Sequence, residues 1–273
     1  MKLPDAKSHK GQNGKLLIIG GSSLFHSASL WAAELASHFV DMVHYASTEE
    51  NAQIFINLKT KFTNGIVVGQ KDIPHYTRED DVVLIGPGMM RRDKNTPDDE
   101  AKYTKEITRL VLTSSPDKKV VCDAGALHEI DTHLLKGRSA KVIVTPHQIE
   151  FAALFGTDLS SKSDDEKERI VQEAAKENDC VIIMKSTTDY VSDGTSSFRI
   201  EGGNAGLTKG GSGDVLSALI ASLYTKNDAL TSCVLGSYLI KTAADKLFDT
   251  VGYWYNIDDL IKAIPSVLVR ERS

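Results

Sequence analysis

Short apolar runs that stop abruptly at a small or polar residue are the feature that most limits how this chain can fold. Each run has four or five residues, enough for a strand buried on both faces and too few for a helix. The runs lie at 15–19, 82–85, 119–122, 141–144 and 180–184, and amphipathic helical patterns lie between them, for example at 28–40, 96–113 and 164–177. This alternation predicts an α/β fold in which helices cover both faces of a mostly parallel sheet, in one domain over residues 1–273. The turn signal Asp193-Gly194 inside 190–200 predicts an antiparallel hairpin at the sheet's edge.

The residues that follow these strands are the first indication of a site, because parallel sheets bind ligands beyond the carboxyl ends of their strands. Those residues are Gly20-Gly21-Ser22, Gly86-Pro87-Gly88, Asp123, Thr145-Pro146-His147 and Lys185. Any single one of them also suits an ordinary turn. A lone carboxylate at the end of a buried strand is costly unless it is paired, which favours a functional role for Asp123. Lys185 either neutralises phosphates or extends its amine to solvent.

Composition and charge exclude several classes of protein. The net charge of -5 and the pI of about 5.9 argue against a nucleic-acid partner. No apolar stretch reaches the roughly 18 residues of a membrane span, and residues 1–14 lack the apolar core of a signal peptide. Three distant cysteines indicate a reducing compartment, so we expect a cytoplasmic protein without a membrane partner. No His, Cys and Asp set has zinc spacing, and we expect no metal ligands from the chain itself.

The most glycine-rich segment, NAGLTKGGSGDVLSALIASLY at 204–224, predicts an anion site. One helical face follows it, formed by Val215, Leu216, Leu219, Ile220 and Leu223. The three glycines Gly210, Gly211 and Gly213 therefore stand at a helix N-terminus, where free amides and the helix dipole bind phosphate. An aspartate at such a site repels the anion unless it has a chemical role. We expect Asp214 to take a proton from a hydroxyl that attacks a phosphoryl group.

Two common phosphate-binding motifs do not match this glycine turn. A Walker loop needs Gly-Lys-Ser/Thr directly before the helix, and here Lys209 precedes the glycines. A dinucleotide fingerprint belongs after the first strand, where Gly20-Gly21-Ser22-Ser23 does not match it. An ordinary flexible helix cap remains the alternative, although Asn204 and Gly206 extend the pattern upstream.

A second motif, Thr145-Pro146-His147-Gln148, has the form of a capping box with Thr145 as the N-cap, proline at N1 and Gln148 at N3. A capping box leaves His147 and Glu150 without a role. His147 either belongs to a pocket or only starts the helix. Glu150 either holds a metal-bound water or occupies the favourable first turn.

Taken in order, these segments resemble the signature of ADP- or ATP-dependent NAD(P)H-hydrate dehydratases of the ribokinase-like superfamily. The matching stretches are SHKG at 8–11, GGS at 20–22, GPG at 86–88, DAGAL at 123–127, TPHQIEF at 145–151 and GGSGDVL at 210–216. The chain departs from the family pattern at several places, among them Gly125, where a second aspartate is usual, Ile149, where a glycine is usual, and Lys185-Ser186, where Lys-Gly is usual.

The resemblance implies a ribokinase-like fold and dehydration of hydrated NADH or NADPH. In that reaction the ring hydroxyl is phosphorylated by ADP or ATP and phosphate is then eliminated. The resemblance also implies that Asp214 is the catalytic base and that the substrate is contacted by Gly88, Asp123, His147 and Asp214. The nucleotide phosphates would be bound by Lys185, Asn204, Gly210, Gly211, Ser212 and Gly213.

The partners follow from the same resemblance. ADP is the expected co-substrate rather than ATP, with Mg²⁺ carried on the nucleotide. A separate NAD(P)H-hydrate epimerase would act in the same pathway, and the chain would assemble as a homo-oligomer such as a tetramer. Two alternatives stay open at this point. One is a hydroxyethylthiazole or hydroxymethylpyrimidine kinase of the same superfamily, and the other is a nucleotide-binding protein without catalysis.

Overall fold

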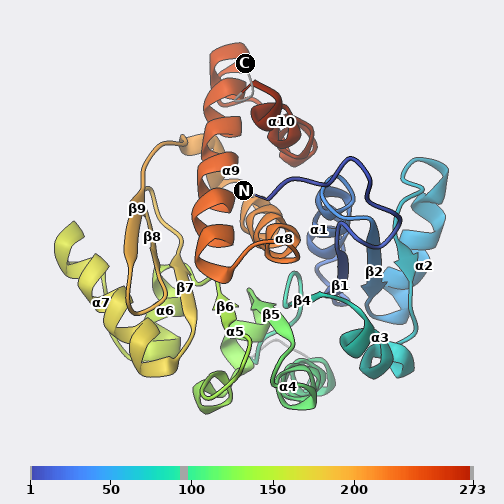
Figure 1. Ribbon diagram of the computed structural model, residues 1–273, viewed down its shortest axis with the longest axis horizontal. Helices are drawn as coiled ribbons and strands as arrows, with labels where there is room; N and C mark the ends of the chain where they lie inside the picture. Colours follow the sequence, from blue (N-terminus) through green and yellow to red (C-terminus); the bar gives the residue numbers. More distant parts are fainter. Residues whose placement is uncertain (1, 93–97, 271–273) are drawn as a thin grey trace.

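A sheet of nine strands forms the centre of the computed structural model, which describes residues 2–92 and 98–270 (Figure 1). The strand order is β3-β2-β1-β4-β5-β6-β7-β8-β9, parallel from β1 to β7 and antiparallel at β8 and β9. The strands are β1 (Lys15–Ile19), β2 (Met42–Ala46), β3 (Ile66–Val67), β4 (Val82–Ile85), β5 (Lys119–Cys122), β6 (Val142–Val144), β7 (Val181–Met184), β8 (Asp189–Ser192) and β9 (Ser197–Ile200). The predictions of a mostly parallel α/β sheet and of an edge hairpin are confirmed.

Helices cover both faces of this sheet (Figure 1). One face carries α1 (Ser27–Ala36), α2 (Glu49–Asn57), α8 (Ser212–Tyr224), α9 (Ala229–Val251) and α10 (Ile257–Arg270). The other carries α3 (Ile73–Glu79), α4 (Asp98–Ser114), α5 (Gly125–Glu129), α6 (Gln148–Phe155) and α7 (Asp164–Asn178). Along β1, Leu16 and Ile18 pack on the first side and Leu17 and Ile19 on the second. Both faces of a strand are thus buried, which explains why the runs are apolar throughout.

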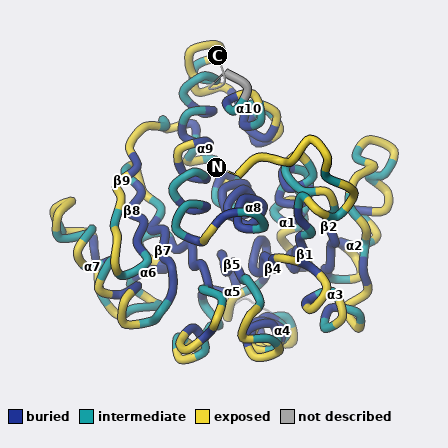
Figure 2. The backbone as a smooth tube through the Cα atoms, viewed as in Figure 1, coloured by how far each residue is buried: buried dark blue, intermediate teal, exposed yellow. Residues whose placement is uncertain are grey.

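Burial falls from the middle of the sheet to its edges (Figure 2). The central strands are buried along their length, whereas Phe198 on the edge strand β9 is 45% exposed. Cys122, Cys180 and Cys233 are buried free thiols. Among the described residues, no helix is both long enough and apolar enough to cross a bilayer.

The sequence did not indicate every element. The helical pattern at 28–40 ends earlier, at Ala36, and the strand β2 that follows was not predicted. β2 is apolar only in part, because it contains His44 and Tyr45, whose polar groups are paired in the interior. The helix expected at 96–113 is α4, and its expected start at Thr96-Pro97 lies outside the described residues.

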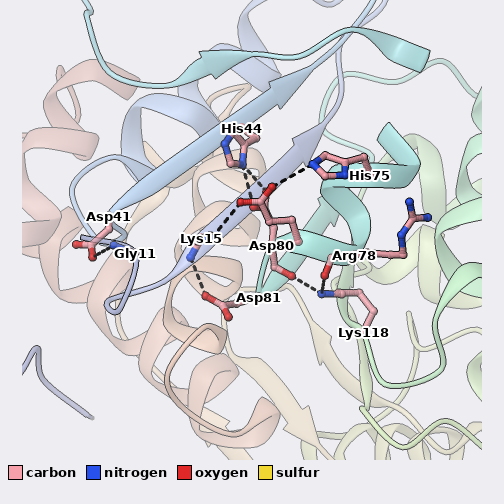
Figure 3. A network of polar contacts seen from close by, with 10 residues as sticks. Gly11, Lys15, Asp41, His44, His75, Arg78, Asp80, Asp81 and Lys118 are labelled. Carbon is pink, nitrogen blue, oxygen red and sulfur yellow. Dashed lines mark hydrogen bonds and ion pairs between the residues drawn. The ribbon is translucent and has the colours of Figure 1, made fainter. Parts of the chain in front are cut away.

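The amino ends of the strands carry a network of paired polar groups (Figure 3). The Nδ1–H of His44 on β2 donates to the Asp80 carboxylate at 2.8 Å, and both side chains are buried. The backbone N–H of Lys15 donates to Asp81 at 2.8 Å, and the Lys118 ammonium donates to the Asp80 carbonyl oxygen. Burial raises the pKa of Asp80, and His44 opposes this effect without cancelling it. The charged groups of this network are therefore bonded to other groups of the protein.

Candidate active site

The carboxyl ends of the parallel strands bring the expected loops together. Gly20, Gly86, Asp123, Thr145 and Lys185 follow β1, β4, β5, β6 and β7, which are neighbours in the sheet. Gly86 has φ +122°, and a Cβ there would lie 1.7 Å from the carbonyl oxygen of Asp123. The loops after β4 and β5 pack so closely that only glycine fits at this position of the GPG turn.

Asp123 is a buried carboxylate with two partners. Its Oδ1 accepts a hydrogen bond from the Lys185 Nζ at 2.8 Å and from the Thr145 hydroxyl at 2.6 Å. The carboxylate is 1% exposed, so both partners are needed to offset its desolvation. Burial alone would lower the pKa of Lys185, but the carboxylates of Asp123, Glu150 and Asp214 raise it, and they prevail. Lys185 therefore stays charged and does not extend to solvent.

Asp214 lies in the first turn of α8 and lines a cavity of about 470 Å³. The wall of this cavity includes Phe25, Gly88, Met89, Arg91, His128 and Glu150. Burial raises the pKa of Asp214 to about 7, and the negative charge of Asp123 adds to the effect while Lys185 opposes it. A carboxyl group whose pKa lies near neutrality is able both to accept and to return a proton.

The glycine turn beside Asp214 presents backbone amides at the start of α8. Gly211 is the N-cap with φ +105°, and a Cβ there would lie 2.6 Å from the Trp31 ring. The Ser212 N–H donates to the Lys209 carbonyl oxygen at 3.2 Å. In the described part of the chain, no acceptor binds the amides of Gly211 and Gly213, and the buried Ser212 hydroxyl has no partner. These groups retain hydrogen-bonding capacity for an anion.

Lys185 places a positive charge next to this turn. A methyl group built on Gly213 would lie 3.4 Å from the Lys185 Nζ, an ordinary contact distance. One ammonium thus lies between the Asp123 carboxylate and the amide-lined turn. This arrangement suits a group that holds phosphate charge close to the two aspartates.

The side-chain amide of Asn204 is bonded to other residues of the protein and does not face the glycine turn as a free group. Its Oδ1 accepts from the Gly206 N–H at 3.0 Å and from the Tyr255 hydroxyl at 2.9 Å, and its Nδ2 donates to Asp245 at 3.1 Å. A Cβ on Gly206 would lie 2.3 Å from the Tyr255 ring. Asn204 therefore shapes the loop that leads to the glycine turn.

The capping box after β6 is shifted by two residues from the expected one. The N-cap of α6 is His147, whose Nδ1 accepts from the N–H of Ile149 at 3.1 Å and of Glu150 at 3.3 Å. Glu150 occupies N3 and accepts from the His147 N–H at 2.9 Å. The assignment of Thr145 as N-cap was wrong, because its hydroxyl bonds to Asp123 and the backbone stays extended until His147 pairs with Lys185.

Glu150 is a buried member of the cavity wall with two histidine neighbours. Its Oε1 lies 3.4 Å from the His147 Nε2 and 3.7 Å from the His128 Nε2. Burial would raise the pKa of Glu150, but His128, Lys185 and His147 lower it, and they prevail. Glu150 is therefore a carboxylate at neutral pH. Burial lowers the pKa of His147, which favours its neutral ring.

Two of the departures from the family motifs, Gly125 and Ile149, have different structural settings. Gly125 lines the cavity, and a Cβ there would lie 2.3 Å from the Met89 carbonyl oxygen, so no larger residue fits. Ile149 is 76% exposed and is not part of the cavity wall. Ala124, before Gly125, has φ +44°, a strained conformation of the kind that clusters at functional sites.

The expected site residues thus fall into four groups. Gly88 and Asp214 line the cavity, and Asp123 and Lys185 are joined beside it. Gly210, Gly211, Ser212 and Gly213 form the amide turn, while Asn204 and His147 are anchored in neighbouring loops. Sequence reasoning missed Phe25, Met89, Arg91 and His128 in the cavity wall. Position was their one signal in the sequence, because Phe25, Met89 and Arg91 lie within three residues of a recognised glycine turn and His128 lies five residues after Asp123.

Comparison with known proteins identifies the family. The family model described as NAD(P)H-hydrate dehydratase matches residues 16–266. The ADP-dependent (S)-NAD(P)H-hydrate dehydratase of Nitrosopumilus maritimus is 30% identical over 275 residues, which cover 96% of this chain and 91% of that protein. The bifunctional NAD(P)H-hydrate repair enzyme Nnr of Methanocaldococcus jannaschii is 34% identical over 272 residues, 97% of this chain. The chain spans 50% of the length of that bifunctional relative.

A solved structure shares the fold. It is the ADP/ATP-dependent NAD(P)H-hydrate dehydratase from Bacillus subtilis co-crystallized with ATP/Mg²⁺, with a TM-score of 0.82 and 23% identity over 99% of this chain and 94% of that one. The ribokinase-like fold prediction is confirmed. With the family model matched along most of its length, this chain belongs to the NAD(P)H-hydrate dehydratase family.

Proposed function

We propose that this chain restores hydrated NADH or NADPH to the reduced cofactor at the expense of ADP or ATP. The observation that carries the proposal is the position of Asp214, whose carboxyl group lines the cavity in the turn where α8 presents its amides. A hydroxyl group in the cavity and a phosphoryl group on the turn would meet at this residue. Family membership supports the same reaction.

The mechanism begins with removal of a proton by Asp214. The hydroxyl oxygen of the hydrated ring attacks the terminal phosphorus of the nucleotide, Asp214 accepts the hydroxyl proton, and AMP or ADP leaves. The amides of Gly211 and Gly213 and the Lys185 ammonium stabilise the charge on the moving phosphoryl group. Phosphate then departs with the C–O bonding electrons as a proton is lost from the neighbouring carbon, which restores the double bond. Phosphate leaves far more readily than hydroxide, which is why a nucleotide is consumed.

Mg²⁺ fits this site as an ion brought by the nucleotide. Within residues 2–92 and 98–270, no group of three or more His, Cys, Asp or Glu side chains is placed to hold a metal. The charged carboxylate of Glu150 is available to hold a water of such an ion. When bound, Mg²⁺ supplies neutralisation of the phosphate charge.

Further parts of the proposal concern partners and setting. We infer ADP as the preferred co-substrate, in keeping with the name of the Nitrosopumilus relative, and an NAD(P)H-hydrate epimerase as the companion activity, in keeping with the bifunctional repair enzymes among the relatives. We also propose a cytoplasmic homo-oligomer organised as a single domain. The assembly is tested by light scattering of the purified protein.

The reaction is tested by incubating the protein with hydrated NADH and either ADP or ATP. Recovery of the near-ultraviolet absorbance of NADH, with release of one phosphate per turnover, is the expected result. Phosphorylation of a small alcohol without recovery of NADH would instead support the kinase alternative. Nucleotide binding with neither reaction would support a protein without catalysis.

A further inference from the structure

A buried lysine outside the catalytic cavity is surrounded by oxygen atoms. Lys241 lies in the middle of α9 and is 4% exposed. Its Nζ donates to the carbonyl oxygen of Thr187 at 2.6 Å and lies 3.3 Å from that of Gly202 and 3.5 Å from that of Ser186. The Oδ1 of Asp189 is 3.7 Å away. Carbonyl oxygens with one carboxylate are the ligands that proteins use for a dehydrated monovalent cation, and here an ammonium occupies their centre.

Among the described residues, Lys241 is the one cation within ion-pair distance of the carboxylate in this cage. Asp189 is 4% exposed and accepts from the Ser186 N–H at 2.8 Å and from the Ser237 hydroxyl at 2.6 Å. Both donors are neutral. Removing the ammonium would leave a buried negative charge uncompensated, which is costly in proteins.

The cage joins two loops of the candidate site. Ser186 and Thr187 directly follow Lys185, the lysine beside the glycine turn. Gly202 lies just before Asn204, which starts the 3-10 turn Ala205–Thr208 ahead of the glycines. One helical turn after Lys241, Asp245 accepts from the Gly203 N–H at 2.9 Å and from the Asn204 amide at 3.1 Å. One face of α9 thus fixes both loops.

We propose that Lys241 is a tethered cation, an ammonium that does in this chain what a bound K⁺ ion would otherwise do. It holds the loop after β7 against the loop at 202–204, so that Lys185 and the glycine turn keep their relative positions. Lys241 is a positioning residue and touches no reacting atom. The chain then needs no monovalent metal ion for nucleotide binding. Only its expected effect on ADP affinity rests on the proposed function.

The test replaces the ammonium and offers an ion in its place. Lys241→Met keeps an unbranched side chain that is one atom shorter and removes the charge. ADP affinity by calorimetry and the melting temperature are measured in choline, sodium and potassium chloride at equal ionic strength. Wild type should behave alike in all three salts. In choline, Lys241→Met should bind ADP about tenfold more weakly and melt roughly 10 °C lower, and K⁺ should restore part of both losses.

Two further variants make the result specific. Lys59 also donates to three backbone carbonyls, those of Thr63, Asn64 and Gly65, but far from the site and without a carboxylate. Lys59→Met should keep wild-type ADP affinity in every salt. In Lys241→Met/Asp189→Asn no buried charge is left unpaired, so this double variant should melt above Lys241→Met and lose the response to K⁺.

Several outcomes would overturn the proposal that Lys241 acts as a tethered cation. They are a K⁺ requirement in wild type, an equal loss for Lys241→Met in all three salts, and a K⁺ response that survives in the double variant. The melting temperatures need no nucleotide. A wild type that fails to bind ADP would therefore contradict the proposed function, while the K⁺ response of Lys241→Met would still decide the role of this lysine.

Discussion

The two ends of the same sheet use charged side chains in opposite ways. At the amino end, His44 and Asp80 are buried and bonded to each other, and the Asp80 carbonyl accepts from Lys118 (Figure 3). At the carboxyl end, the Ser212 hydroxyl is buried without a partner in the described chain, and the pKa of Asp214 is raised to about 7. At the amino end His44, Asp80 and Lys118 are bonded to one another, whereas the carboxyl end retains donors and a titrating carboxyl group beside a cavity.

This difference separates groups that maintain the fold from groups that serve chemistry. Burial raises the pKa of both aspartates, so a perturbed carboxyl group does not by itself mark a site. What distinguishes Asp214 is its access to a cavity and its position in the first turn of a helix. Substitutions at the carboxyl end should therefore reduce turnover, and those at the amino end should reduce stability.

The largest expected effect is that of Asp214→Asn. The amide cannot accept the hydroxyl proton, so kcat should fall about 10³-fold while ADP affinity is retained. Single-turnover kinetics and calorimetry measure the two quantities. A rate near that of wild type would remove Asp214 from its role as base.

The same variant should also be more stable than wild type. Because the pKa of Asp214 is raised in the folded protein, the unfolded chain gives up this proton more readily, and stability falls as the pH rises toward 7. At pH values above 7, Asp214→Asn should raise the free energy of unfolding by about 1–3 kcal/mol. Urea unfolding at pH 8 checks this. A loss of stability would mean that the carboxylate is a structural group.

The opposite pattern is expected for Asp80→Ala. This change leaves the buried His44 ring without its acceptor, and the free energy of unfolding should fall by about 2–4 kcal/mol. The kcat of the folded protein should stay close to that of wild type, since Asp80 lies at the other end of the strands. Asp80→Asn, which keeps an acceptor oxygen for His44, is the matched control and should recover most of the stability. A large fall in kcat would break the distinction between the two ends.

A smaller effect is expected at the glycine turn. A Cβ on Gly213 would make only ordinary contact with Lys185, so the fold should tolerate Gly213→Val. The branched side chain would occupy the space through which phosphate approaches the amides, and ADP should bind at least about tenfold more weakly. Calorimetry of ADP binding, with the melting temperature as a control for folding, measures this. Unchanged affinity would mean that the turn only shapes the protein.

The sequence predicted those elements that depend on the residues of one short segment. Continuous apolar runs predicted the central strands, and Gly210, Gly211 and Gly213 before an apolar helix predicted the start of α8. β2 was missed because a strand can bury His44 and Tyr45 when distant residues supply their partners. Likewise the pairing of Asp123 with Lys185 and the bonds of Thr145 join separate strands. No local pattern contains such contacts.

The arrangement of three charges beside the glycine turn gives the smallest and most specific prediction. Asp214 must lose its proton to act, so kcat/KM should rise with pH through about 7. Asp123 raises the pKa of Asp214 and Lys185 lowers it. Lys185→Met should therefore move the acid limb of the pH profile up by about one pH unit. Asp123→Asn removes a negative charge and frees Lys185 to face Asp214, so the limb should move down by a similar amount.

Opposite shifts would show that these groups set the proton affinity of Asp214 together, whereas a common shift would assign the limb to another group, such as the nucleotide phosphate. Asp80→Asn, at the far end of the sheet, should leave the limb in place, which makes the pH profile a direct measure of how separate the two ends are.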